Sequence, residues 1–161
     1  MLSNRGKYGL KALAHLAGAE GHLVTGAEIA RVDNIPKKFL DAILNDLKRA
    51  GLIHAQKGPR GGYALARPAS EITAGEAIRV IDGALAPIAC ASRNFYRPCS
   101  DCDVATCRVR LLMVQARDAM ATILDGTTLV DLRALGSKQR RALGLPKTKA
   151  AGRKERVLVR A

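Results

Sequence analysis

The sequence has 161 residues, which suits one domain with an appendage. Hydrophobic residues make up 48%, but aromatic residues only 3% with no Trp, so the core must consist mainly of Ala, Leu, Ile and Val, which favours helices. The formal net charge of +13 points to a polyanionic partner such as DNA, RNA or an anionic membrane surface. No apolar stretch approaches the roughly 20 residues needed to span a bilayer, and no secretory signal is visible. We therefore expect a cytoplasmic protein without membrane association.

Positive charge is concentrated at the C-terminal end. Residues 136–161 carry nine Lys or Arg side chains against one acidic residue, a net charge of +8 that leaves +5 for the rest of the chain. Their mixture of Gly, Pro, Lys and Thr is typical of a loop. We interpret this segment as a flexible basic tail, which either adds sequence-independent attraction to phosphates or is solvated and has no task.

Helical periodicity predicts three helices within the first 51 residues. The first covers about residues 5–17. The second begins at a capping box formed by Thr25 and Glu28. The third has Pro36 in its first turn and ends at Gly51. Its predicted inward face consists of Phe39, Leu40, Ile43, Leu44 and Leu47.

The remaining pattern predicts a hairpin and further helices. Two short strands at residues 52–57 and 63–66 flank a turn rich in Gly and Pro. A second capping box, Thr73 with Glu76, begins a short helix. A long helix follows the cysteines and ends near Asp125, and Thr128 caps one more short turn.

A short helix, a tight turn and a longer amphipathic helix form a helix-turn-helix, and the hairpin after them is interpreted as a wing. The start of the third helix, from Pro36 to residue 42, is expected to enter the major groove. Lys37 and Lys38 suit phosphate or guanine acceptors, and Asp41 can accept from a cytosine amino group. Arg60 at the wing tip suits a narrow minor groove. Each element alone is compatible with ordinary solvated charge, but their order in a basic chain predicts DNA binding.

Several short stretches share a family pattern: residues 8–13, 29–30, 39–40 and 47–52, the wing at 58–63, the cysteine loop, and 127–129. In these stretches the chain resembles the regulators of the IscR, NsrR and RirA type, the Rrf2 (Rrf-two) superfamily. The resemblance covers about residues 1–135, and the wing with its flanks is a fairly specific part of it. The basic tail lies outside it.

This resemblance implies a homodimeric repressor that binds double-stranded DNA at a near-palindromic operator. It implies DNA contacts from Lys37, Lys38, Phe39 and Asp41 in the recognition helix, and from Lys57 and Gly58 in the wing. The long helix would pair with its copy in the partner subunit. The interface would then comprise Val109, Leu112, Met113, Ala116, Met120 and Ile123.

The expected fold class is mainly α with a small β-hairpin wing: a winged helix-turn-helix domain plus a long C-terminal dimerisation helix. We divide the chain into a DNA-binding domain at residues 1–66 and a connecting helix at 67–89. A cysteine-rich sensor loop at 90–107 follows, then the dimerisation helix with its cap at 108–135 and the tail at 136–161.

All the cysteines fall in one loop, separated by eight, two and four residues: Cys90, Cys99, Cys102 and Cys107. Thiolates in a flexible segment suit a soft metal, and four thiolates commonly hold an iron–sulfur cluster. A reducing compartment argues against structural disulfides. Nearby Arg93, Arg97 and Arg108 would favour thiolate over thiol and offset the negative charge of a cluster.

In the regulators that the chain resembles, three loop cysteines bind the cluster and a residue other than cysteine supplies the fourth ligand. This chain departs from that pattern, because Arg110 stands where one branch has a His and Lys7 stands where another has an Asp. The additional Cys102 would complete an all-cysteine site within one subunit. Both a [2Fe–2S] and a [4Fe–4S] cluster fit such a site.

Other interpretations stay open for the cysteines and for the whole chain. The cysteines also fit structural zinc, or a thiol switch without a cluster. The chain as a whole also fits a general basic nucleic-acid-coating protein or a metal-storage protein. His15, His22 and His54 form no catalytic arrangement, so we predict that the protein is not an enzyme. The leading hypothesis is a sensor-repressor in which the cysteine loop alters the spacing of the two recognition helices.

Overall fold

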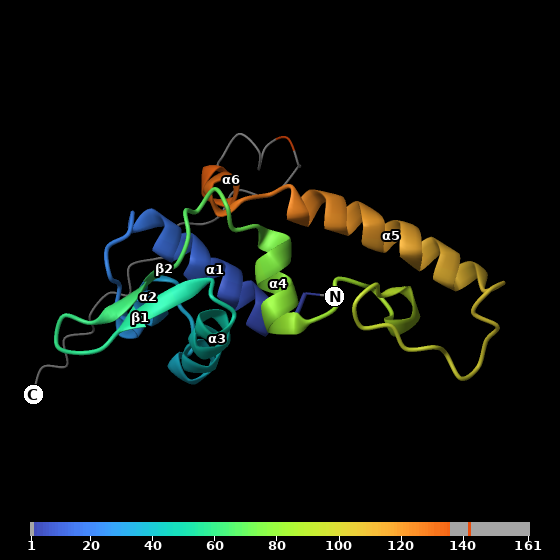
Figure 1. Ribbon diagram of the computed structural model, residues 1–161, viewed down its shortest axis with the longest axis horizontal. Helices are drawn as coiled ribbons and strands as arrows, with labels where there is room; N and C mark the ends of the chain where they lie inside the picture. The colour runs from blue at the N-terminus through green and yellow to red at the C-terminus, as the bar shows by residue number, and fades with distance from the viewer. Residues whose placement is uncertain (1, 136–141, 143–161) are drawn as a thin grey trace, which may run out of the picture.

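The computed structural model describes residues 2–135 and 142 (Figure 1). The first half contains α1 (Asn4–Gly18), α2 (Gly26–Val32), α3 (Lys37–Arg49), β1 (Ile53–Gln56) and β2 (Gly62–Leu65). The second half contains α4 (Ala74–Asp82), the short 3-10 helix η1 (Ala89–Ala91), α5 (Arg108–Asp125) and α6 (Leu129–Ala134). The mainly helical fold with one hairpin is confirmed. The predicted basic tail lies outside the described residues, apart from Ala142.

Figure 1 shows two parts of the molecule. Helices α1 to α4, the hairpin and α6 form a rounded head. Helix α5 extends from the head as a long arm, and the segment between α4 and α5 folds beneath that arm. The start of α5 is therefore the end farthest from α3 and the hairpin. The fold places the predicted DNA-binding elements and the cysteine loop at opposite ends of the molecule.

The core is centred on α1, which contacts α3, α4, α6 and β2. Close packing of α1 on α4 explains two glycines inside a helix, because a side chain at Gly6 would collide with Asp82 and one at Gly9 with Ile81. Asp82 also receives hydrogen bonds from the backbone N–H and the hydroxyl of Ser3, at 2.8 and 2.5 Å. The largest fully buried side chains are Leu13, Leu16, Ile29, Leu40, Ile43, Leu44, Leu47, Leu52, Ile53, Ile72 and Leu129.

Helix starts are set by side-chain caps, with differences from the predicted pattern. Thr25 and Thr73 each accept a hydrogen bond from the backbone three residues on, but the reverse bond from the glutamate is not found there. Glu76 is instead bonded by Arg67 at 2.6 Å. The capping box with both bonds lies at Thr128, with Asp131 as its partner. Pro36 immediately precedes α3 rather than occupying its first turn.

The hairpin pairs β1 and β2 antiparallel, with Ile53 opposite Leu65 and Gln56 opposite Gly62. Val24 adds two backbone hydrogen bonds to Tyr63, which join the segment before α2 to the hairpin. Two glycines are required at the turn. Gly58 has a φ of +114°, a conformation that favours glycine, and a side chain at Gly61 would collide with the backbone of Gln56. The turn therefore projects its tip without bulky side chains at these two positions.

Helix α5 differs from the other long helices because it contains no buried residue. Apolar side chains nevertheless recur along it, and Val109, Leu112 and Ile123 are 62%, 59% and 67% exposed. A helix of a single soluble chain normally turns such a stripe toward a core. None of the described helices is both long and apolar enough to cross a membrane.

Candidate nucleic-acid interface and cysteine site

Helix α3 has one buried and one exposed face. Leu40, Ile43, Leu44 and Leu47 are buried, and the polar face is left free for a partner. The hairpin turn lies on the same side of the head, so the two elements form one surface. Every residue that the sequence predicted to contact DNA is exposed on it: Pro36, Lys37, Lys38, Phe39, Asp41, Lys57, Gly58 and Arg60.

Lys37 and Asp41 form an ion pair across one helical turn, at 2.7 and 2.9 Å from Nζ to the two carboxylate oxygens. Both side chains are more than half exposed. Exposed pairs of this kind contribute little stability, so the pair can open at little cost. Asp41 keeps lone pairs with which it can accept from a base, and more become free if Lys37 moves to a phosphate.

Phe39 corrects the predicted core. The stripe along α3 predicted an inward side chain, but Phe39 is 55% exposed. Its ring packs on the edge of the core against Tyr8 of α1, with the ring centroids 6.4 Å apart and the planes tilted by 49°. This contact supports an aromatic surface at the start of α3, where apolar contact with a thymine methyl group would be possible.

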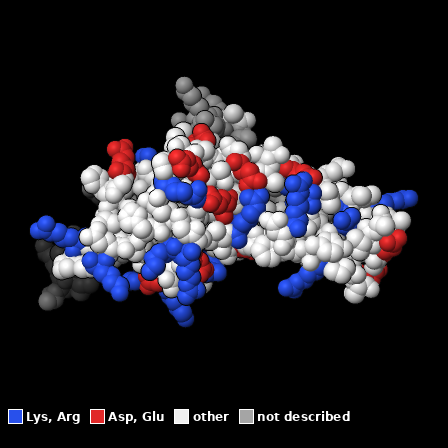
Figure 2. All heavy atoms as spheres, viewed as in Figure 1, with Lys and Arg blue, Asp and Glu red and all other residues white. Residues whose placement is uncertain are grey.

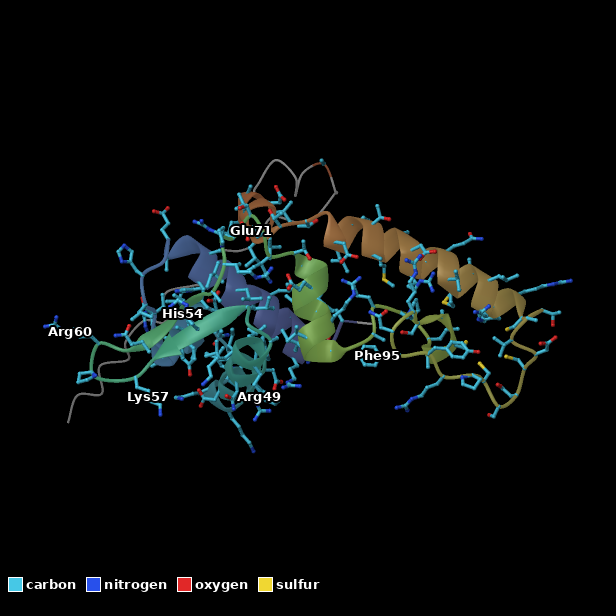
Figure 3. All side chains as sticks on the ribbon, in the orientation of Figure 1. Arg49, His54, Lys57, Arg60, Glu71 and Phe95 are labelled. Atoms are coloured by element: carbon cyan, nitrogen blue, oxygen red, sulfur yellow. The ribbon has the colours of Figure 1, made fainter. Side chains whose placement is uncertain are left out.

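Lysine and arginine side chains gather at the lower left of the molecule, over α3 and the hairpin (Figure 2). Figure 3 shows Arg49 and Lys57 on this side and Arg60 beyond the hairpin tip. A surface of this charge would attract a phosphate backbone. The structure thus brings the recognition helix and the wing together in one basic surface.

The four cysteines also come together. Cys90 is buried in η1, and the other three are partly exposed in the loop that precedes α5. Cys99 lies near enough to shift the pKa of both Cys90 and Cys102, and Cys102 and Cys107 lie near enough to shift each other's pKa. The loop therefore brings the thiols into one region, with the sulfurs of Cys99 and Cys102 within 4.8 Å of each other.

The surroundings shift the pKa values of the thiols in different directions. Cys107 occupies the N-cap position of α5, and the nearby backbone N–H of Arg110 lowers its pKa. Hydrogen bonding with Cys99 and burial raise the pKa of Cys102 to about 12. The pKa of Cys90 is raised, first by its contact with Cys99, while the charge of Arg110 acts in the opposite direction. The helix start therefore favours a thiolate at Cys107.

Asp101 is a potential ligand that sequence reasoning missed. One of its carboxylate oxygens and the sulfurs of Cys99 and Cys102 lie within 4.8 Å of one another. The sequence Cys99-Ser100-Asp101-Cys102 contains the signal, because an acidic residue between two closely spaced cysteines adds an oxygen donor. The site therefore offers five donor residues rather than four.

Arg110 stands at the position that carries a His in one branch of the resembling regulators. Its Nε donates to the carbonyl oxygen of Cys90 at 3.0 Å. Seven residues along α5, Arg117 donates to the carbonyl oxygen of Ala91 at 2.6 Å. Among the described residues, these two arginines tie η1 directly to α5, whereas Arg93, Arg97 and Arg108 are exposed. The start of the cysteine loop is thus fixed to the arm by both arginines.

Comparisons with known proteins place this arrangement in a family. The family model Rrf2, described as an iron-dependent transcriptional regulator, matches residues 2–134. The chain belongs to the Rrf2 family. Its members are transcriptional regulators that bind DNA. DNA is therefore the class of partner that suits the basic surface of α3 and the hairpin.

Individual relatives agree with this assignment. The chain is 38% identical to an Rrf2-like HTH-type transcriptional regulator of Rhodobacter capsulatus, over 85% of this chain and 95% of the relative. It is similar to the structure of CymR, the global cysteine regulator of Bacillus subtilis, with 32% identity and a TM-score of 0.69. That match covers 85% of this chain and 98% of CymR. The structure of T. potens IscR, at 24% identity and a TM-score of 0.64, shares the fold over 92% of this chain and 93% of that one.

Proposed function

We propose that this Rrf2 regulator is a homodimeric repressor whose DNA affinity is set by the state of its cysteine site. The observation that carries the proposal is the convergence of Cys90, Cys99, Cys102 and Cys107 at the start of the α5 arm. The site is held on a helix with an unpaired apolar stripe, so a change at the cysteines would act on the surface that pairs two subunits.

DNA recognition is assigned to α3 and the wing. Lys37, Lys38, Phe39 and Asp41 would meet the major groove, because they lie at the exposed start of α3. Lys57, Gly58 and Arg60 would meet the backbone or the minor groove beside it. Two copies of this surface, related by a two-fold axis, would favour a near-palindromic operator.

Dimerisation is assigned to α5. Val109, Leu112 and Ile123 are mostly exposed, and Met113, Ala116 and Met120 are partly exposed. Burial of such a stripe against its copy removes apolar surface from water at about 25 cal/mol per Å². The arm carries no buried residue in the single chain, which supports an interface in this position.

The donor set fits an iron–sulfur cluster. Four thiols in one loop, one of them favoured as a thiolate by a helix start, match the ligands that such clusters use. Cys102 would be the fourth cysteine ligand, and Asp101 is the oxygen donor beside it. When bound, a cluster would supply sensitivity to iron supply or oxidation. Contacts of the chain itself hold Cys90 beside α5, and Cys107 directly precedes that helix, so loss of ligation would free the segment between these two cysteines.

The proposal is tested by anaerobic purification of the full chain with iron and acid-labile sulfide assays. DNA affinity is then measured by fluorescence anisotropy for the loaded and stripped forms. We expect stoichiometric iron and sulfide, and a change of at least about tenfold in operator affinity between the two forms. The variant with Cys90, Cys99 and Cys107 changed to Ala should lose both responses, and Ser100→Ala is the matched loop control. Equal DNA affinity in all forms, under every iron and redox condition, would contradict the sensing role.

A thiol switch without a metal is the second candidate. It is favoured by the closeness of Cys99 and Cys102, whose sulfurs lie within 4.8 Å of each other, because disulfide formation needs two thiols that can meet. A protein that stays free of iron after anaerobic reconstitution, yet forms a loop disulfide with diamide, would support it. Stoichiometric zinc without iron would support the zinc alternative instead.

Deletion of residues 137–161 separates a regulator from a general basic coating protein. The regulator would retain its preference for an operator over random DNA, because that preference is assigned to α3 and the wing. A coating protein would lose its binding with the basic residues that it depends on.

A further inference from the structure

The described part of the chain contains a cavity of about 470 Å³ between α4, the segment after α4, and α5. This volume lies within the range of roughly 300–1,000 Å³ that is typical of small-molecule sites. The proposed regulator function does not use the cavity.

Charged side chains in its lining leave one positive charge in excess, because three arginines face two aspartates. Arg79 and Asp125 satisfy each other through two hydrogen bonds of 2.6 and 2.8 Å. Asp118 is shared by Arg93 and Arg117, whose bonds all end on the same carboxylate oxygen. The excess positive charge therefore lies between Arg93 and Arg117.

Arg93 is the guanidinium that can turn to a ligand. Its side chain is 73% exposed and makes one bond of 3.1 Å to Asp118. The Arg117 side chain is only 12% exposed and bonds Asp118 at 2.7 and 2.9 Å. Asp118 would keep a partner if Arg93 moved, so the cost of the movement is small.

Part of the lining is apolar. Phe95 is 55% exposed, and Figure 3 shows it near the C-terminal end of α4. Gly83 lies near this ring, since a side-chain carbon at Gly83 would be in ordinary van der Waals contact with it, at 3.9 Å. Ala84, Leu85 and Ala121 also belong to the apolar part of the lining. A ligand with a hydrocarbon part would cover this surface, whereas a bare inorganic anion would leave it in water.

We propose that the cavity is a binding site for a small organic acid, with its carboxylate on Arg93 and its hydrocarbon part against Phe95. A guanidinium forms two parallel hydrogen bonds with a carboxylate, which matches the fork of donors that Arg93 offers. The lining of the cavity does not include the four cysteines, so the residues that would bind the acid are distinct from the sulfurs of the cysteine site.

A bound acid could affect the cysteine loop through the arginines of the cavity. Arg93 and Arg117 both line the cavity, and Arg117 also bonds the carbonyl oxygen of Ala91 next to Cys90. A ligand that draws Arg93 from Asp118 would change how the segment after Cys90 is held on α5. A bound acid could therefore alter the contact between the loop and α5, as a second signal beside the state of the cysteines.

The test is isothermal titration calorimetry of the full chain with phenylacetate, hexanoate and succinate as probes. Phenylacetamide is the neutral counterpart of phenylacetate, and inorganic phosphate is the anion without hydrocarbon. We expect saturable binding of phenylacetate or hexanoate, at least about tenfold weaker binding of phenylacetamide, and weak binding of phosphate. Arg93→Gln and Phe95→Ala should each weaken carboxylate binding by about tenfold. Arg97→Gln, which removes an exposed arginine of the same loop outside the cavity, should leave it unchanged.

Three results would overturn the proposal. They are no binding of any carboxylate, equal binding to the Arg93→Gln protein, or binding of phosphate as tight as that of phenylacetate. Both variants change exposed side chains, and circular dichroism checks that they fold. Repeating the titration on the triple cysteine variant separates this site from the proposed sensor, because carboxylate binding should persist there even if the sensing role fails.

Discussion

Arg117, in the middle of α5, donates a 2.6 Å hydrogen bond to the carbonyl oxygen of Ala91, the residue after the buried thiol of Cys90. The same guanidinium donates to the carboxylate of Asp118, which also accepts a hydrogen bond from Arg93 of the loop. Because the donor is on the arm and the acceptor is on the loop, this contact joins the cysteine site to the proposed dimer helix.

Arg117→Gln should loosen the loop without unfolding the head. Loss of a charged donor to a buried carbonyl costs about 1–3 kcal/mol. We expect faster hydrogen exchange at residues 89–93 and a lower melting temperature, whereas exchange in α3 should stay unchanged. Arg108→Gln, at an exposed position at the start of the same helix, is the control. Identical exchange in the wild type and Arg117→Gln would mean that the loop is held by other contacts.

Phe39 and Leu40 are adjacent in sequence but face different surroundings. Phe39→Ala should weaken operator binding by on the order of 1 kcal/mol, while lowering the free energy of unfolding by about 1 kcal/mol at most, because it loses only the contact with Tyr8. Leu40→Ala removes a fully buried side chain and should cost about 2–5 kcal/mol of stability. Urea denaturation and DNA titration of both variants check this contrast. A large loss of stability in Phe39→Ala would instead show that Phe39 is part of the core.

Why sequence reasoning placed Phe39 inside is a matter of helix geometry. Adjacent residues on a helix point about 100° apart, so a broad apolar stripe includes positions at its edge, and the tertiary contact decides their burial. The helices and the hairpin were predictable, because each has a period, a cap or a turn signal of its own. The predicted first helix, for example, differs from α1 by one residue at each end.

The contacts around the cysteine site had no such signal. Arg110 and Arg117 bond backbone carbonyls that lie 20 and 26 residues earlier in the chain, and any residue offers a carbonyl. Spacing alone indicated that the cysteines belong together, but it did not indicate what anchors them. The oxygen of Asp101 was not predictable in the same way, because an exposed carboxylate in a loop is common without a metal and only the folded loop brings it within 4.8 Å of the sulfurs of Cys99 and Cys102.

Lys57→Ala should change the salt dependence of DNA binding. If Lys57 neutralises one phosphate, its removal lowers the slope of log affinity against log salt by about 1 and weakens operator and random DNA alike. Anisotropy titrations at several salt concentrations measure the slope. Lys7→Ala, an exposed lysine on α1, is the control for a general loss of charge. A selective loss of operator binding would instead assign Lys57 to base recognition.

The apolar stripe of α5 is tested by Leu112→Asp and Ile123→Asp. Each places a charge at a side chain that is more than half exposed in the single chain, so the fold of the head should be unaffected. In a dimer the charge would be buried without a partner, which is costly. Sedimentation velocity should therefore show a shift from dimer to monomer. Val130→Asp, at an exposed apolar position on α6, is the control, and an unchanged dimer in both α5 variants would exclude this stripe as the interface.

Acid should weaken the contact between α4 and α5 at Asp125. The hydrogen bonds from Arg79 lower the pKa of Asp125 below its usual 3.8. A carboxyl whose pKa is lower in the folded state stabilises the fold above its unfolded pKa, and this contribution is lost as the pH falls through the folded pKa. The melting temperature of the wild type should therefore exceed that of Asp125→Asn at neutral pH, and the difference should shrink from about pH 5 downward. Glu71→Gln removes an equal charge from an exposed site and should show no comparable convergence. A difference that stays constant to pH 3 would mean that Asp125 acts through its shape and hydrogen bonding, and not through its charge.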